Sequence, residues 1–237
     1  MEYMSFRNTY WNYYIQIERD FFSYAPYCEI DEQNTNAFST RYLQLLLSIC
    51  GEIDSIFKTF CKVLKPDLDT NTCGMTEYID IITDIYPTFA LETVEVVGYQ
   101  YKEICPWRSI HHNKHIPNWW SKYNKVKHHR DEIENGKENY KNATQGNVIE
   151  ALSALYILIE YWAAFNLVID DGEEKNTTLP RFKSEQFRLT KWNFYWSFLG
   201  GGEWLDTKSF FEYINPSTCP NDSNKNNSKE EAPYEFL

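Results

Sequence analysis

The residues best suited to chemistry lie together between Trp119 and Arg130, in the segment WWSKYNKVKHHR. His128 carries an imidazole, a side-chain type that can take a proton from a ribose 2′-hydroxyl or return one to a leaving 5′-oxygen. Asn124 lies four residues earlier and would share a helix face with His128. The pair predicts a general acid/base site in which Asn124 orients the histidine or a phosphate.

Cationic and aromatic side chains surround this pair. Positive charge close to a phosphate stabilises the transition state of its transfer. The residues that we expect to contact phosphate or RNA are Lys122, Lys125, Lys127, Arg130 and Tyr123. Adjacent helical residues point about 100° apart, so we assign the chemistry to His128 and expect His129 to face solvent or support an interface. The other interpretation is a solvated basic helix surface without a site.

Two indoles open the segment, and they allow two interpretations. Trp119 and Trp120 either anchor an interface between two copies of the chain or lock the helix onto its own core. Asn118 is placed to cap this helix, and Gly136 is placed to break it. Glu52, at the margin of an apolar stripe earlier in the chain, is a further candidate for an interface or supporting role.

The spacing of the histidines offers one candidate metal site. All five histidines fall between His111 and His129, and His111 with His115 has the i, i+4 spacing that can hold a transition metal on a helix. No carboxylate stands at ligand spacing nearby, no cysteine follows a zinc pattern, and Pro117 disfavours a long helix there. We therefore expect neither metal nor cofactor, and a metal-dependent enzyme is the third hypothesis for function.

The elements that position these residues are predicted to be helical. Apolar residues recur every three or four positions, which predicts helices over 9–24, 38–64, 76–85, 118–135 and 143–169. The residues expected in the core are Ile49, Ile53, Ile56, Phe60, Leu152, Leu155 and Ile159. Around Gly98, β-branched and aromatic residues predict a short extended insertion over 92–105. The fold class expected is mostly all-α.

Composition divides the chain into three parts. Residues 1–170 carry the helical pattern, residues 171–214 form an aromatic-rich C-terminal extension expected to pack on the bundle, and residues 215–237 are polar and predict a flexible tail.

The balance of charge limits the partners. The 237 residues contain 23 Lys and Arg against 34 Asp and Glu, a net charge of −11, so broad attraction to nucleic acid or to an anionic membrane is not expected. The N-terminus lacks the build of a signal peptide, and the most apolar segment, 151–169, is interrupted by Glu160 and Asn166. We expect a soluble, cytoplasmic protein with free thiols and no membrane contact.

The spacing of Asn124 and His128 in YNKVKH resembles the RNxxxH element of the HEPN superfamily, α-helical proteins found as RNases in toxin–antitoxin, phage-defence and CRISPR-linked systems. The similarity extends over about Thr9 to Ile169 as a pattern of helices, including two long antiparallel helices. It implies a HEPN-like bundle of four to five helices. It also implies a metal-independent endoribonuclease whose composite site is shared by the two subunits of a homodimer, with RNA and an antitoxin-like protein as partners.

The sequence departs from this motif at one position, because Tyr123 stands where the family has arginine. Arginine binds phosphate through a planar fork that lysine does not reproduce. Lys122, Lys127 or Arg130 could compensate for its loss. The alternative is a catalytically inactive HEPN-like module that binds RNA or a protein partner.

Overall fold

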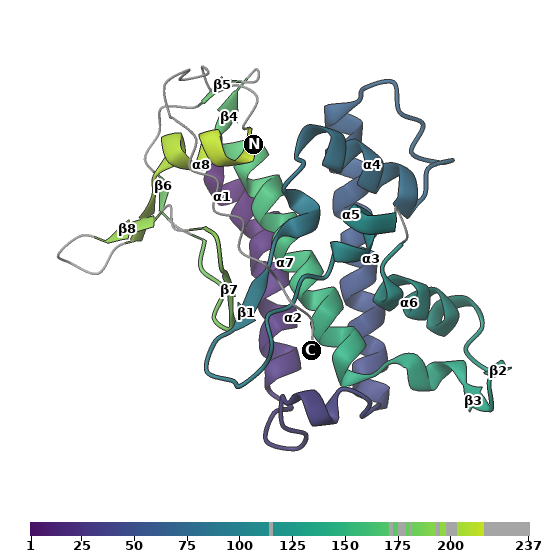
Figure 1. Cartoon of the computed structure of the whole chain (residues 1–237). Helices are drawn as coiled ribbons and strands as arrows, with labels where there is room; N and C mark the ends of the chain where they lie inside the picture. The colour runs from purple at the N-terminus through teal and green to yellow at the C-terminus, as the bar shows by residue number, and fades with distance from the viewer. Residues whose placement is uncertain are drawn as a thin grey trace, which may run out of the picture.

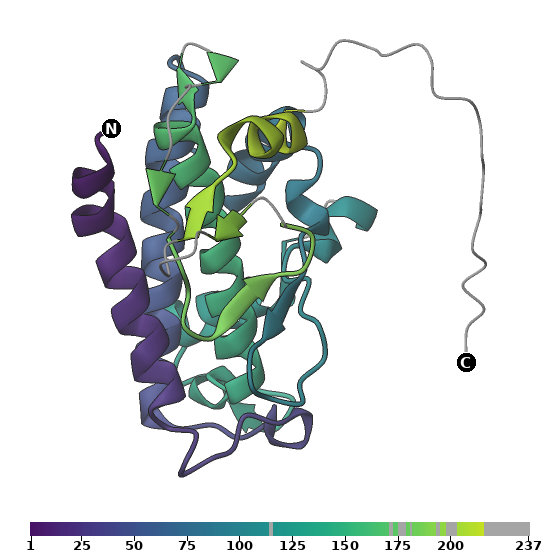
Figure 2. The ribbon, with the colours of Figure 1, turned by 90° about the vertical axis from the view of Figure 1, so that its left-hand side faces the viewer.

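Three long helical segments run side by side in the computed structural model of the chain (Figures 1 and 2), which describes residues 1–113, 116–170, 173–174, 179–180, 182–192, 195–197 and 203–215. Most of these residues are helical, so the expectation of a mostly all-α fold is confirmed. The tail expected over 215–237 lies outside the described residues except for Asn215.

The first segment comprises α1 (Tyr3–Phe6), a π-helical turn η1 (Arg7–Trp11) and α2 (Asn12–Phe22). The helix therefore begins six residues earlier than the predicted boundary at Thr9. A π-helical turn inserts an extra residue into the helical repeat. Most aromatic residues of this segment face inward, and Phe6, Tyr14 and Phe21 are fully buried, whereas Tyr13 is exposed.

The second segment, α3 (Thr40–Leu64), begins at a cap that satisfies one of its free N–H groups. The hydroxyl oxygen of Ser39 accepts a hydrogen bond from the N–H of Tyr42 at 3.0 Å. The predicted apolar stripe of α3 lies in the core, where Ile49, Ile53 and Ile56 have no exposed surface. The shorter α4 (Met75–Ile85) packs against α3 (Figure 1).

The third segment, α7 (Gln145–Leu167), begins beside α3 and runs parallel to it (Figure 1). The N–H of Gln145 donates to the carbonyl of Ala37 at 2.8 Å, and that of Gly146 donates to the carbonyl of Thr35 at 2.9 Å. A Cβ at Gly146 would lie 3.0 Å from both the Cβ and the carbonyl oxygen of Thr35. Only glycine permits this close approach without a shift of the backbone.

Nearly every side of α7 is covered by other elements, which places it at the centre of the molecule. Its contacts include α2, α3 and α6, and the predicted core residues Leu152, Leu155 and Ile159 are fully buried. By length and composition α7 could cross a membrane, but 89% of its most apolar window is buried inside the protein. That burial is what the core helix of a soluble bundle shows.

The insertion expected over 92–105 contains β1 (Val94–Val96), which pairs antiparallel with β7 (Phe187–Leu189) of the C-terminal segment. A bridge between Val94 and Ile104 closes the insertion on itself. The other described elements of the C-terminal segment are β4 (Ile169–Asp170), β5 (Glu173–Glu174), β6 (Leu179–Pro180), β8 (Tyr195–Ser197), β9 (Glu203–Leu205) and α8 (Thr207–Ile214). β9 is the central strand of a three-stranded sheet with β6 and β8.

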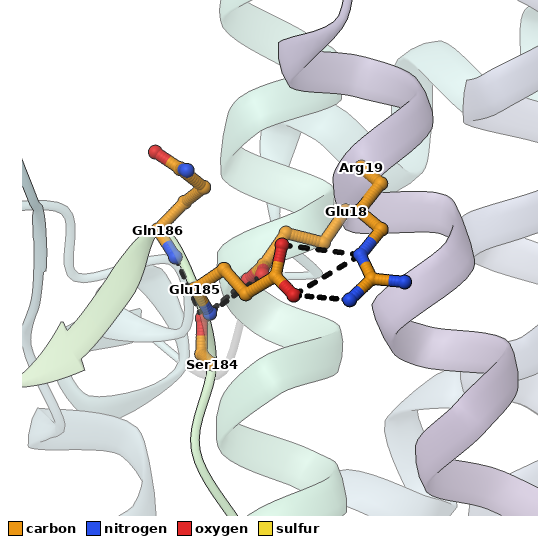
Figure 3. A network of polar contacts seen from close by, with 5 residues as sticks. All are labelled: Glu18, Arg19, Ser184, Glu185 and Gln186. Carbon is orange, nitrogen blue, oxygen red and sulfur yellow. Dashed lines mark hydrogen bonds and ion pairs between the residues drawn. The ribbon is translucent and has the colours of Figure 1, made fainter.

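A buried carboxylate on α2 ties the C-terminal segment to the bundle. The Oε1 atom of Glu18 accepts a hydrogen bond from the main-chain N–H of Glu185 at 2.8 Å. Its Oε2 atom accepts hydrogen bonds from the hydroxyls of Tyr14, at 2.5 Å, and Ser184. At the surface, the guanidinium of Arg19 pairs with the carboxylate of Glu185 (Figure 3). Burial raises the pKa of Glu18, although its hydrogen-bond donors oppose that rise.

Glu92 is a second buried carboxylate that links the C-terminal segment to the helices through hydrogen bonds. Its Oε1 atom accepts hydrogen bonds from the hydroxyls of Tyr161 on α7, at 2.7 Å, and Tyr213 on α8, at 3.0 Å. Burial raises the pKa of Glu92 as well. The C-terminal segment is thus held on the helices by polar contacts as well as by its aromatic rings.

The region around the predicted site differs from expectation in two respects. The histidine-rich stretch, where Pro117 disfavours a long helix, contains the short helix α5 (Arg108–Asn113), and α6 (Asn118–His128) ends well before Gly136, the predicted end of that helix. Asn135 and Gly136 both have positive φ and turn the hairpin of β2 (Ile133–Glu134) and β3 (Lys137–Glu138), as Asn-Gly pairs do in two-residue hairpins. The remaining short helical turns are η2 (Glu32–Asn34), η3 (Phe89–Leu91) and η4 (Asn139–Asn142).

Candidate functional site

One face of α6 is anchored in the core by large side chains. The buried residues of this face are Trp119, Trp120, Tyr123 and Val126. The indole ring of Trp119 lies edge-on to that of Trp107, with 5.2 Å between the ring centroids. α6 starts at Asn118 with Pro117 at the capping position, so Asn118 is not the cap that the sequence suggested.

This anchoring matches the second interpretation of Trp119 and Trp120, in which they lock the helix onto its own core, and it removes Tyr123 from the residues that can contact RNA. Trp119, Trp120 and Tyr123 are only 1%, 7% and 4% exposed, so their rings are not on the surface where RNA or a second copy would meet them. The ring of Tyr123 packs against that of Trp120 at 4.9 Å and lies beneath the ammonium group of Lys127. Tyr123, which stands at the position of the arginine in the RNxxxH element, is therefore buried on the core-facing side of α6.

Asn124 and His128 lie one turn apart on the same side of α6, as their spacing predicted, with Asn124 half-buried and His128 exposed. His128 is the last residue of the helix and is exposed. His129 points elsewhere, because its Nδ1 atom lies 2.9 Å from the carboxylate of Glu132. The two imidazole centroids are 6.4 Å apart. The structure thus separates the two histidines, and it gives His129 a carboxylate neighbour.

The cations of the last turns of α6 are partly engaged by nearby groups. Lys125 forms an ion pair with Glu134 on the β2–β3 hairpin, and this hydrogen-bonded contact lowers the pKa of Glu134. The Nε atom of Arg130 donates to the carbonyl of Val126 at 3.3 Å. Exposed pairs of this kind add little stability, but they do reduce the positive charge that α6 presents to a phosphate.

Lys122 does not lie beside the other residues that were predicted to contact phosphate. At 100° per residue it lies about 120° around α6 from His128, and it lines a pocket on the side of α7. The predicted site residues therefore do not share one face. Asn124 and His128 lie along one edge of α6, Lys127 lies about 100° from His128 with its ammonium over the buried ring of Tyr123, and Lys122 lines this pocket.

The pocket lies between residues 101–106, the start of α6 and the first turns of α7. It consists of two cavities of about 360 and 330 Å³ that share Tyr101, Lys102, Asn118 and Glu150, a size typical of small-molecule sites. The lysines and asparagines of the second cavity are Lys102, Lys122, Lys137, Asn36, Asn118, Asn142 and Asn147. We call the two cavities together the lysine–asparagine pocket.

Its floor is the one stretch of α7 between residues 145 and 164 that other elements leave half-exposed. Gly146, Asn147 and Glu150 share this face at three- and four-residue spacing. Burial raises the pKa of Glu150, and the ammonium group of Lys102 opposes that rise. Burial and the nearby charge of Glu150 also raise the pKa of Tyr101 to about 12. The pocket therefore combines an aromatic ring, a carboxylate, amides and cations.

Most of the polar residues that line this pocket were missed in the sequence. Lys102, Lys137, Asn147 and Glu150 come from three separate elements, and no local spacing links them. One signal was available, since Asn147 and Glu150 are polar positions three apart at the start of an otherwise apolar helix. Such a pair marks a face that the core does not cover.

The remaining predicted residues do not join this pocket. Glu52 is half-buried on α3, where burial raises its pKa, and it is not among the residues that line the pocket. The His111–His115 spacing of the third hypothesis falls outside the described residues, as do the side chains of 111–114. Within the part of the chain that the structure describes, no three His, Cys, Asp or Glu side chains are grouped to hold a metal ion.

Comparisons with known protein families, with curated proteins and with solved structures found no match to this chain. The function is therefore argued from the pocket and from the exposed edge of α6.

Proposed function

We propose that this protein is a cytoplasmic, HEPN-like module that binds single-stranded RNA at the lysine–asparagine pocket and the adjoining edge of α6. The observation that carries the proposal is the lining of the pocket. Four cations, Lys102, Arg108, Lys122 and Lys137, line the pocket with the carboxylates of Glu103 and Glu150, and Glu32 pairs with Lys102 at 4.0 Å beside it, although the whole chain has a net charge of −11. Local positive charge in an acidic protein favours one confined anionic ligand.

Single-stranded RNA suits this arrangement better than a duplex. A duplex is held mainly through its phosphates along an extended basic face, which an acidic chain does not provide. In a single strand the bases are unstacked and can enter a pocket, where side-chain amides bond their edges and an aromatic ring stacks on them. Asn118, Asn147 and Tyr101 offer these groups, and the lysines can contact the phosphates.

Cleavage of the bound strand is the second candidate function, and the exposed position of His128 favours it. His128 could act as general acid or base, with Asn124 one turn before it on the same side of α6. Because Tyr123 is buried, the phosphate charge would have to be met by Lys127, whose ammonium lies over the Tyr123 ring, or by a second copy of the chain. A composite site of this type requires a homodimer. A defence or toxin–antitoxin role would follow from such an activity.

Binding is tested with labelled single-stranded RNA by fluorescence anisotropy, in EDTA and at fixed salt. The double variant Lys122→Gln/Lys137→Gln should weaken binding by about tenfold for each lost phosphate contact. The matched control is Lys58→Gln/Lys65→Gln, which removes the same charge from α3 and its C-terminal end. Absence of binding by the native chain, or equal losses in both double variants, would refute the proposal.

The same reactions, analysed on a denaturing gel, separate binding from cleavage. Products formed in EDTA support metal-independent cleavage, and intact RNA in the bound complex supports a binding module. Sedimentation with and without RNA tests the homodimer. A monomer of 28.3 kDa under both conditions would remove the composite site while leaving RNA binding in place.

A further inference from the structure

The carboxylate of Glu150 is the most unusual group in the lysine–asparagine pocket. It lines both cavities where they meet, on the half-exposed face of α7. It accepts no hydrogen bond from the described residues, whereas the buried carboxylates of Glu18 and Glu92 are each bonded to at least two donors. A half-buried carboxylate is acceptor-only when ionised, so a ligand that fills this pocket must bring donors to it.

We propose that the lysine–asparagine pocket holds one guanine of the bound RNA, with the Glu150 carboxylate accepting hydrogen bonds from the N1–H and N2–H₂ groups of the base. This inference rests on the function proposed above and specifies its substrate. Guanine carries two neighbouring N–H donors on its Watson–Crick edge, and these match the two oxygens of one carboxylate. The paired contact is of the charge-assisted, bidentate kind.

The other bases do not meet this requirement. Adenine and cytosine place a ring-nitrogen acceptor beside their amino group, and uracil places its single N–H between two carbonyl oxygens. Each would direct at least one acceptor toward Glu150, and a buried acceptor facing an acceptor is unfavourable. A correct bidentate pair discriminates against the wrong base by about 1–3 kcal/mol, which corresponds to a factor of about five to 150 in affinity.

The rest of the pocket completes a nucleotide site. Tyr101 shares both cavities with Glu150 and supplies an aromatic face on which a base can stack. The amide of Asn147 is fixed, because its Nδ2 atom donates to the carbonyl of Asn142 at 2.8 Å. Lys122 and Lys137 line the second cavity, where they can meet the phosphates. The two cavities thus offer separate surroundings for a base and for its phosphates.

Ionisation of Glu150 should control the base preference. Burial raises the pKa of Glu150, so guanine preference should be present above that raised pKa and fall as pH drops through it. The other titratable and charged side chains lining the cavities are Tyr101, Lys102, Glu103, Cys105, Arg108, Lys122 and Lys137. Glu103 is the second carboxylate among these lining residues, and a Glu103→Gln variant controls for it; Asp31 and Glu32 act on the neighbouring Tyr101 from outside the cavities.

The test is calorimetric titration of the full chain with 5′-GMP, AMP, CMP, UMP and inorganic phosphate, together with a uridine oligomer that contains a single guanosine. The native protein should bind GMP about five to 150 times more tightly than the other nucleotides. Glu150→Gln should lose this preference, because its amide places a donor against a donor. Glu150→Asp should retain part of it, and Glu103→Gln should retain all of it. Circular dichroism establishes that each variant is folded.

The outcomes separate this inference from the proposed function. RNA binding with no base preference, or a guanine preference that survives in folded Glu150→Gln, overturns the guanine pocket and leaves RNA binding standing. Binding of inorganic phosphate as tight as that of GMP also overturns it. If neither RNA nor any nucleotide binds, the proposed function falls together with the inference.

Discussion

The indole Nε1 of Trp119 donates a hydrogen bond to the main-chain oxygen of Pro106 at 3.1 Å. Trp119 belongs to α6 and Pro106 ends the segment 101–106, so this bond joins two walls of the lysine–asparagine pocket. The sequence allowed Trp119 either to anchor a dimer interface or to lock the helix onto its own core. The structure places it in the core, where it sets the spacing between the elements that line the pocket.

The first prediction concerns this bond. Trp119→Phe keeps an aromatic ring but removes the donor and leaves the carbonyl of Pro106 unpaired, which should lower the free energy of unfolding by about 1–3 kcal/mol. Urea unfolding followed by circular dichroism measures the change. Trp120→Phe is the matched control, since Trp120 is also buried but makes no such bond within the described residues. Equal losses in both variants would show that ring volume, and not the bond, matters here.

Two glycines should respond to alanine with opposite signs. At Gly146 a Cβ would meet Thr35 at 3.0 Å, so Gly146→Ala must displace the start of α7 and should lower stability by about 1–3 kcal/mol. Gly51 is exposed on α3 with nothing within 4 Å of a built Cβ, so Gly51→Ala should raise stability by about 0.4–1 kcal/mol. Thermal unfolding of both variants shows whether each substitution raises or lowers the stability. Stabilisation by Gly146→Ala would contradict the close contact between α7 and Thr35.

If the protein cleaves RNA, the two adjacent histidines should differ. His128→Ala should abolish cleavage while leaving stability within about 0.5 kcal/mol, because the side chain is exposed at the end of α6. His129→Ala should lose much less, since His129 faces the carboxylate of Glu132. Cleavage rates in EDTA give the comparison. Equal loss of activity, or a greater loss from His129→Ala, would show that the spacing of Asn124 and His128 is coincidental.

The pH dependence of stability should report the buried Glu18. Its folded-state pKa is raised above the ordinary value of 4.5, so its contribution to stability is fully present below that value and is lost as pH rises through the folded pKa. Glu18→Gln does not ionise and should lack this decline. The variant should therefore become more stable relative to the native protein as pH rises. The free energies of unfolding of both proteins, measured from pH 4 to pH 8, give this difference. A constant difference would mean that Glu18 does not titrate in this window.

The sequence by itself determined the helices and the core. Apolar side chains at Ile53 and Leu155 follow the period of the α-helix, and that period sets which face is buried whatever the neighbouring element is. For the same reason the face shared by Asn124 and His128 was correctly predicted. Helix ends were less accurate, since α6 stops at His128 and the Asn135–Gly136 turn belongs to a separate hairpin.

Only the tertiary structure decided what the exposed residues meet. Lys102, Lys137 and Glu150 come from three elements and gather in one pocket because α6 and residues 101–106 leave the first turns of α7 partly uncovered. Local periodicity holds no information about such contacts, which depend on how whole elements pack. Packing also buried Tyr123, where a family motif would place a phosphate-binding side chain, and turned Lys122 away from His128 toward the pocket.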